Sequence, residues 1–308
     1  MTTPQLVVSV PDLGMVQTIG DVPDGVEFIV WDLSGPPPRE EIDLVVPPYL
    51  VGPSVLAQLS GVKTRLVQSP TLGYDGVKEH LPPGQVFANA VSVHETSTAE
   101  LTLALILASQ RGIPDFVRAA SQGHWERSWR TSLADRQVLL VGYGGVGKAI
   151  EARLLPFEVT VTRVAHYARM DERGEIYDVD SLDQLLPIAD IVVIAVPLSE
   201  DTTHLVDDAF LTRMKEGSLL VNIARGPVAD TDALLAHASS GRLRLALDVT
   251  DPEPLPDGHP LFALTNVLIS PHVGGATTAA IPRLGRLLHE QIGRLLRGEE
   301  PLNVVFRT

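Results

Sequence analysis

A glycine-rich turn near the middle of the chain has the spacing of a phosphate-binding loop. Gly142, Gly144 and Gly147 directly follow an apolar run and open a helical pattern, which gives G-x-G-x-x-G between a strand and a helix. The first glycine permits the tight turn, the second lets a pyrophosphate approach, and the third allows the helix to pack closely on the strand. Backbone N–H groups of Gly145 and Val146 would face the phosphates. The motif predicts a dinucleotide site, with a plain glycine-rich loop as the alternative.

The end of the next strand-like run bears on which dinucleotide fits. A carboxylate about 20 residues beyond the turn normally binds the ribose 2′-hydroxyl of NAD. Here no acid occurs between Val161 and Asp171, whereas Arg163, His166 and Arg169 all lie in that segment. Cations at this place suit a 2′-phosphate. The sequence therefore predicts a preference for NADP over NAD, unless these side chains are only solvated surface charges.

Three later segments carry polar side chains at the ends of strand-like runs, where open α/β sheets bind their ligands. They contain Arg225, the pair Asp248 and Glu253, and His272. Taken alone, Arg225 is typical of a surface cation, and His272 is typical of a core or capping histidine. Their joint occurrence behind a dinucleotide turn favours a reaction centre, because an imidazole titrates near neutral pH and can donate a proton.

The elements that must position these groups alternate between strand-like and helical patterns. The first series of short apolar runs covers residues 6–10, 27–31, 43–46 and 65–68. The second series covers residues 137–141, 159–164, 191–196, 218–223, 243–249 and 266–269. Runs that are buried on both faces and alternate with helices indicate parallel sheets.

Several helices are predicted between and after these runs. Residues 97–109 are apolar and free of Gly and Pro, and residues 146–155 and 233–238 have helical patterns. Ser181 has the capping-box spacing that marks a helix start. The stretch 281–297 predicts an amphipathic helix that packs back on the first unit. Its apolar stripe consists of Leu284, Leu287, Leu288, Ile292 and Leu295. We therefore expect two domains, one from residues 1–94 and 278–308 and one from residues 95–277.

Composition excludes several classes of protein. A chain of 308 residues with 44% hydrophobic content can build two cores, and the absence of cysteine excludes disulfides and thiolate chemistry. The net charge of −14 disfavours nucleic-acid and membrane partners. The first five residues lack the features of a secretory signal, and no apolar stretch approaches the roughly 20 residues that span a bilayer. We expect a cytoplasmic protein in which an anionic substrate requires a local arginine.

Together the glycine turn and the three segments resemble the D-isomer-specific 2-hydroxyacid dehydrogenase family, of the glyoxylate/hydroxypyruvate reductase kind. The similarity is dense over residues 134–277 and includes stretches at 190–198, 202–206 and 214–222. The resemblance implies an α/β protein, with a doubly wound Rossmann-type parallel sheet in the cofactor domain and a discontinuous flavodoxin-like substrate domain. It also implies a homodimer, since residues 97–109 correspond to the family's dimer-forming region.

The resemblance gives the polar groups roles in reducing a 2-keto acid. Arg225 would hold the carboxylate and the carbonyl oxygen with its planar fork. His272 would donate a proton to that oxygen, and Glu253 would stabilise the imidazolium. Backbone N–H groups of Leu72 and Gly73, in a segment that looks like the family's carboxylate loop, would complete the substrate site. No metal is needed for this chemistry.

Further residues are implied to contact the cofactor. Asp248 would hold the nicotinamide carboxamide. The others implied by the resemblance are Pro197, Thr202, Ile223, Ala224, His272, Gly274 and Gly275. One departure from the family pattern is Glu158, which stands where a glycine is common.

Three functions remain in competition. Reduction of glyoxylate or hydroxypyruvate to the D-2-hydroxy acid is favoured, and a larger 2-keto acid such as phenylpyruvate is the alternative substrate. Formate dehydrogenases share the scaffold but have glutamine where this chain has Glu253. A non-catalytic dinucleotide-sensing protein is the third possibility, and replacement of His272 would distinguish it from an enzyme.

Overall fold

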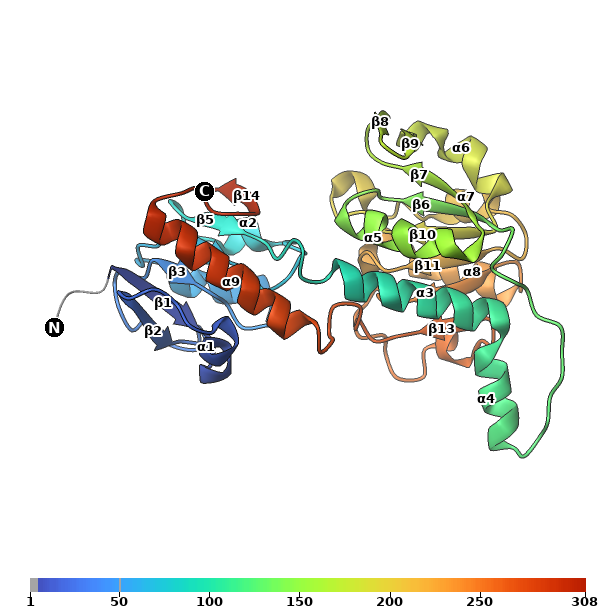
Figure 1. Ribbon diagram of the computed structural model, residues 1–308. Coiled ribbons are helices and arrows are strands. Elements are labelled where there is room, and N and C mark those ends of the chain that lie inside the picture. The colour runs from blue at the N-terminus through green and yellow to red at the C-terminus, as the bar shows by residue number, and fades with distance from the viewer. Residues whose placement is uncertain (1–4, 50) are drawn as a thin grey trace. The chain divides into compact units, whose positions relative to one another are not determined.

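The structure is a computed structural model that describes residues 5–49 and 51–308 (Figure 1). The chain divides into two compact units, one formed by Met1–His94 with Thr277–Thr308 and the other by Glu95–Ala276. Residues 1–4, which belong to the segment without signal-peptide features, lie outside the described residues.

The first unit is built on a six-stranded sheet in the order β14-β5-β4-β3-β1-β2. All pairs are parallel except β14 with β5. The five parallel strands have the order 2-1-3-4-5 of flavodoxin-like sheets, which confirms that part of the predicted fold. The strands are β1 (Leu6–Val10), β2 (Val26–Val30), β3 (Leu44–Val45), β4 (Leu66–Gln68), β5 (Val86–Ala88) and β14 (Val304–Arg307). The helices are α1 (Leu13–Ile19), α2 (Val77–His80) and α9 (Ala280–Arg297).

Helix α9 completes the core of the first unit, as its apolar stripe predicts. Leu284, Leu288 and Ile292 are buried in one cluster with Leu6 and Val8 of β1. Figure 1 shows α9 lying across this unit next to α1. Strand β14, which follows α9, was not predicted, because its four residues are too short to carry a clear pattern.

The second unit contains a six-stranded parallel sheet in the order β13-β12-β11-β10-β6-β7. Beyond β7, Tyr177 forms one parallel bridge with Val164, so the outermost position of a Rossmann sheet is reduced to a single pairing. The strands are β6 (Gln137–Val141), β7 (Thr160–Val164), β8 (Arg169–Asp171), β9 (Gly174–Ile176), β10 (Ile191–Ile194), β11 (Leu219–Asn222), β12 (Arg244–Leu247) and β13 (Val267–Ile269). The helices are α3 (Glu95–Arg111), α4 (Ile113–Ser121), α5 (Gly145–Leu154), α6 (Leu182–Leu185), α7 (Asp208–Arg213) and α8 (Thr231–Ser239).

The predicted capping box at Ser181 is wrong, although a helix does begin there. The Ser181 hydroxyl donates to Asp178 at 2.9 Å and caps no helical N–H. A reciprocal box of this type forms instead between Ser199 and Thr202, ahead of the short helical turn at Glu200–Thr202. The spacing of residues could not show which serine forms the box, because Ser181 donates instead to Asp178, three residues upstream.

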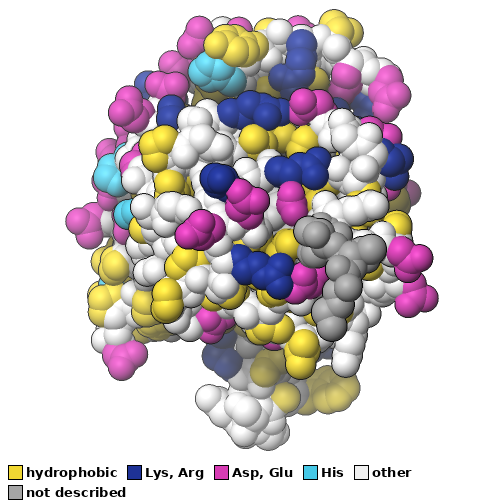
Figure 2. All heavy atoms as spheres, turned by 90° about the vertical axis from the view of Figure 1, so that its left-hand side faces the viewer, with side chains coloured by type: hydrophobic (Ala, Val, Ile, Leu, Met, Phe, Trp, Pro, Cys, Tyr) yellow, Lys and Arg dark blue, Asp and Glu magenta, His cyan; other side chains and the backbone are white. Residues whose placement is uncertain are grey.

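Charged side chains of the first unit lie mostly in pairs at its surface. Examples are Lys63 with Glu41 at 2.7 Å and Arg297 with Glu299 at 2.7 Å. Figure 2, which views the molecule from the left-hand side of Figure 1, shows basic side chains interspersed with acidic ones on that face. Among the described residues, no helix is long and apolar enough to cross a bilayer.

Candidate active site

The glycine turn follows β6 with a geometry that two of its glycines require. Gly142 has φ of +106°, and a Cβ there would lie 2.4 Å from the carbonyl oxygen of Ala195. A Cβ on Gly147 would lie 2.3 Å from the carbonyl oxygen of Gly142. Any side chain at either position would therefore push α5 or β10 away from the turn.

Gly144 has no such steric constraint, because a Cβ there would meet no described atom within 4 Å. It is the N-cap of α5, and no side chain caps this helix. The N–H groups of Gly145 and Val146 lie in the first turn of α5, at the positive end of the helix dipole, and a Cβ on Gly145 would lie 3.3 Å from a carboxylate oxygen of Glu95. An uncapped helix start beside an open glycine fits the pyrophosphate of a dinucleotide.

The structure does not place Arg163 where the predicted contact with the cofactor requires it. Its side chain is buried, pairs with Asp171 at 3.3 Å and Glu151 at 3.6 Å, and donates to the carbonyl oxygen of Arg173 at 2.6 Å. A guanidinium held by these partners does not face solvent. We therefore withdraw Arg163 as a ligand of the 2′-phosphate.

Glu151 of α5 joins the glycine turn to the hairpin formed by β8 and β9. It is 3% exposed, accepts from the hydroxyl of Tyr143 in the turn, and pairs with Arg173 in the hairpin at 2.6 Å. Burial and the hydrogen bond to Glu151 raise the pKa of Tyr143. These contacts hold the hairpin beside the turn, which no pattern in the sequence indicated.

His166, just after β7, and Arg169, the first residue of β8, are exposed. The Arg169 guanidinium donates to the carbonyl oxygen of Tyr143 at 3.1 Å and to that of Tyr167 at 3.3 Å. The His166 ring meets Tyr167 edge-on at 4.2 Å between ring centroids. Two of the three predicted cations thus lie on the outside of this strand end, one of them in contact with the glycine turn.

His272 and Glu253 form a direct contact in the second unit. The Nδ1 atom of His272 lies 2.5 Å from Oε1 of Glu253, and the two side chains are 41% and 43% exposed. His272 has φ of +53°, a left-handed conformation that is uncommon for residues other than glycine. With Nδ1 engaged by a carboxylate, the exposed ring keeps Nε2 for another partner.

Asp248 shapes the loop that carries His272. Its buried carboxylate accepts from the hydroxyl of Ser270 at 2.7 Å and from the N–H groups of Val273 and Gly274 at 2.9 Å each. The backbone N–H of His272 donates to the Asp248 carbonyl oxygen at 2.7 Å. This anchoring function was missed, because the sequence gives no sign that the residue binds protein backbone.

Arg225 follows β11 in a tightly packed loop. Its guanidinium donates to the carbonyl oxygen of Ala224 at 2.7 Å, and Asn222 donates to the carbonyl oxygen of Arg225 at 3.2 Å. A Cβ on Gly226 would lie 1.9 Å from the carbonyl oxygen of Thr250, so the loops after β11 and β12 are in direct contact. Arg225 itself is partly exposed.

Leu72 and Gly73 lie in the first unit, in the loop after β4. Asn89 donates to the carbonyl oxygen of Leu72 at 2.9 Å, and the Thr71 hydroxyl donates to that of Gly73 at 3.0 Å. The backbone N–H groups of Leu72 and Gly73 donate to none of the described residues. The loop is thus fixed through its carbonyls while two donors stay available.

The other predicted cofactor residues lie in loops after β10, β11 and β13. Thr202 donates to the carbonyl oxygen of exposed Pro197 at 2.7 Å. Ile223 and Ala224 are buried, at 8% and 5% exposure. Gly274 is buried and Gly275 is partly exposed. These loops leave the carboxyl ends of parallel strands, the same edge as the glycine turn.

Comparison with known proteins gives consistent matches. A family model described as D-isomer specific 2-hydroxyacid dehydrogenase, NAD binding domain, matches residues 103–274. A glyoxylate reductase of Thermofilum pendens is 34% identical over 77% of this chain and 73% of its own length. A human glyoxylate reductase/hydroxypyruvate reductase is 30% identical over 87% of this chain and 88% of its own length.

Solved structures agree with these sequence matches. A D-isomer specific 2-hydroxyacid dehydrogenase from Xanthobacter autotrophicus Py2, solved with NADPH and MES, is 28% identical, has a TM-score of 0.82, and covers 98% of each chain. An NADPH-dependent glyoxylate/hydroxypyruvate reductase from Sinorhizobium meliloti, solved with NADP and sulfate, has a TM-score of 0.82 at 24% identity, with coverage of 99% and 98%. The second likeness supports the fold.

Proposed function

The chain belongs to the D-isomer-specific 2-hydroxyacid dehydrogenase family, and we propose that it reduces a small 2-keto acid of the glyoxylate or hydroxypyruvate type to the D-2-hydroxy acid, with NADPH as reductant. The observation that carries this proposal is the 2.5 Å contact between His272 and Glu253 on a loop anchored by Asp248. A carboxylate on Nδ1 leaves Nε2 to deliver a proton, which carbonyl reduction requires.

Each residue has one task in the proposed reaction. A bound reduced nicotinamide supplies the hydride for the carbonyl carbon. Arg225 binds the substrate carboxylate and carbonyl oxygen through its planar guanidinium. His272 donates a proton to that oxygen, and Glu253 stabilises the imidazolium before transfer. The N–H groups of Leu72 and Gly73, which donate to no described residue, are donors of the kind that a carboxylate accepts from.

NADP rather than NAD is the proposed cofactor. The support is the absence of an acid at the end of β7, together with exposed His166 and Arg169 there. Arg169 contacts Tyr143 in the glycine turn, and the buried Glu151 contacts hold the hairpin that carries it. Comparison of kcat/KM for NADPH and NADH tests this, and a clear preference for NADH would refute it.

A homodimer is the proposed assembly. Helix α3, the family's dimer-forming region, has one side packed in the core of its own unit. The adjoining α4 and the segment after it leave Val117 63% exposed and Trp125 95% exposed, which is unusual for apolar side chains of this size. Light scattering on a sizing column should give about twice the 33.2 kDa of one chain. A monomer would contradict the proposal.

Replacing His272 tests whether the protein is an enzyme of this kind. A panel of 2-keto acids, followed by NADPH absorbance, should identify glyoxylate or hydroxypyruvate as the best substrate, and preference for phenylpyruvate would favour the larger class. His272→Gln should then lower kcat by about 10²–10⁴-fold. His289→Gln, at an exposed position on α9, is the matched control. Equal, measurable rates in all three proteins would show that His272 is not the proton donor, and no reduction by any of them would leave only a dinucleotide-binding role.

A further inference from the structure

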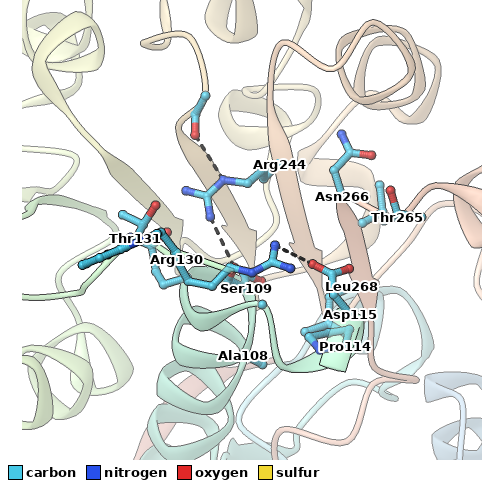
Figure 3. A pocket seen from close by; sticks show the side chains of 15 residues that line it. Ala108, Ser109, Pro114, Asp115, Arg130, Thr131, Arg244, Thr265, Asn266 and Leu268 are labelled. Carbon is cyan, nitrogen blue, oxygen red and sulfur yellow. Dashed lines mark hydrogen bonds and ion pairs between the residues drawn. The ribbon is translucent and has the colours of Figure 1, made fainter. Parts of the chain in front are cut away.

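Hydrogen bonds to backbone carbonyl oxygens distinguish a cavity of the second unit from a loop of the first. In the cavity, shown in Figure 3, Arg244 donates to the carbonyl oxygens of Gly217 at 3.1 Å and Ser109 at 3.4 Å. Much of its lining comes from the end of α3, the start of α4 and residues 129–131, which belong to the region of the proposed homodimer. The loop of residues 69–73, which follows β4, instead has all its carbonyl oxygens bonded within the first unit.

Each carbonyl oxygen of the 69–73 loop accepts from a different donor. In the order of the loop, the donors are the Gln68 amide at 2.9 Å, His94 Nε2 at 2.7 Å, the Ala90 N–H at 2.9 Å, the Asn89 amide at 2.9 Å and the Thr71 hydroxyl at 3.0 Å. A peptide unit is planar, so a bond to its carbonyl oxygen also fixes the direction of the N–H on the following residue. The loop therefore has its N–H groups oriented by the residues that hold its carbonyls.

Two of these peptide planes carry the N–H groups that donate to no described residue. The backbone N–H of Ala90 holds the plane that joins Thr71 to Leu72. The Asn89 side chain holds the plane that joins Leu72 to Gly73. Asn89 directly follows β5 and is 8% exposed. Its amide thus orients the Gly73 N–H by holding the other side of the same peptide unit.

His94 holds the same loop one peptide plane further back. It is 5% exposed, its ring stacks on Tyr49 with 5.8 Å between ring centroids, and its Nε2 holds the plane that joins Pro70 to Thr71. A carbonyl oxygen can only accept, so Nε2 carries a proton in this contact. Buried polar side chains are stable where they are hydrogen-bonded, as Asn89 and His94 both are. The proposed reaction gives neither of them a task.

From these contacts we propose that Asn89 is a positioning residue for the substrate carboxylate, with His94 in a smaller supporting role. Asn89 holds the peptide plane of Leu72 and Gly73, so that the Gly73 N–H is oriented before the substrate arrives and less entropy is lost on binding. Both residues act through the loop and not on the reacting atoms. The inference rests on the proposed reduction of a 2-keto acid whose carboxylate binds at Leu72 and Gly73.

Asn89→Ala tests the assignment through the Michaelis constants. It should raise KM for the preferred 2-keto acid about tenfold and leave kcat and the KM for NADPH within about twofold, because the loop contributes binding and not chemistry. Oxamate, an unreactive analogue of a 2-keto acid, should lose affinity for the NADPH complex to the same extent in calorimetry. His94→Phe keeps a ring beside Tyr49 and should raise KM for the keto acid about threefold, which gives a second test if Asn89→Ala does not fold.

Asn303→Gly is the matched control. The Asn303 side chain donates to the carbonyl oxygen of Val91, two residues beyond Asn89, and glycine suits its φ of +57°. This change removes a hydrogen bond to the same segment but none to the loop, so both KM values should stay as they are. Equal losses in Asn303→Gly and Asn89→Ala, a raised KM for NADPH in Asn89→Ala, or unchanged oxamate affinity in Asn89→Ala and His94→Phe would overturn the inference alone. Unsubstituted protein that binds no oxamate would refute the proposed substrate site, and the inference with it.

Discussion

The first strands of the two sheets, β1 and β6, are alike at their amino ends and different at their carboxyl ends. Asp43 precedes β3 and accepts from the N–H of Val7 in β1 at 2.8 Å. Asp190 precedes β10 and accepts from the N–H of Gln137 in β6 at 2.9 Å. In both units an aspartate ahead of the neighbouring strand thus binds the start of the first strand.

At the carboxyl ends the helix starts are treated in opposite ways. Asp12 caps α1 by accepting from the N–H of Met15 at 2.9 Å. Gly144 leaves α5 without a side-chain cap. The cap residue of α1 supplies a carboxylate to its helix, whereas the cap residue of α5 has no side chain and leaves room for an anion from outside, with Glu95 near the next residue, Gly145. The amino ends therefore serve stability, and the first helices of the two units differ in whether a side chain caps them.

An aspartate at the N-cap of α5, like the one that caps α1, should have the largest effect, a loss of NADPH affinity. Gly144→Asp should weaken NADPH binding about 100-fold, equivalent to ~2.7 kcal/mol, because it places a negative charge where the pyrophosphate belongs. Gly144→Asn has nearly the same size without the charge and should weaken binding much less. Fluorescence titration of both variants checks this, and equal losses would contradict the role of charge.

The two aspartates, Asp190 and Asp43, should differ in how much each contributes to the free energy of unfolding. Burial tends to raise the pKa of Asp190, but hydrogen bonds from Lys215 and the Gln137 N–H outweigh it and lower the pKa overall. Asp190→Asn should therefore cost about 1.5 kcal/mol of unfolding free energy at pH 7. Because the folded pKa is depressed, this cost should shrink as pH falls below about 4.

Asp43→Asn is the comparison for that experiment. Its nearest cation, Arg65, is 3.8 Å away, whereas Lys215 lies 2.6 Å from Asp190, and Asp43 is the more exposed carboxylate. The loss should be smaller, as measured by urea unfolding followed by far-UV circular dichroism. A pH-independent cost for Asp190→Asn, or a larger cost for Asp43→Asn, would show that the two sites are not related as described.

Removing the cap of α1 should have the smallest effect. Asp12→Ala should lower stability by about 1 kcal/mol, because the Met15 N–H loses its acceptor. Trp31 is 6% exposed in the core of the first unit, so its fluorescence reports unfolding there. NADPH affinity should not change. Asp24→Ala, at an exposed position of the same unit, is the control, and a change in cofactor affinity would count against the assignment.

Much of the fold could be predicted because its signals are local. The glycine spacing of the turn marks two positions, Gly142 and Gly147, that admit no side chain, and the apolar stripe of 281–297 places α9 on the first unit's core. Both strand series are present as strands. These features depend on periodicity and on the steric limits of glycine, which can be read without knowing any distant contact.

What could not be predicted depends on contacts between distant residues. Arg163 belonged with its exposed neighbours by sequence, and only the positions of Glu151 and Asp171 explain its burial. The anchoring of the His272 loop by Asp248 spans more than twenty residues in the same way. Glu158 takes a left-handed φ of +59° where the family commonly has glycine, so local preference was overruled by the surrounding turn.

The discontinuity of the first unit sets an order for folding during synthesis. Residues 95–276 form a contiguous unit whose core contains only its own side chains. The other unit lacks Leu284, Leu288 and Ile292 of its core until α9 has left the ribosome. Domains usually fold in the order in which they emerge. Here the second unit can fold first, while the strands made earliest wait, with apolar surface open to chaperones, for a helix made near the end.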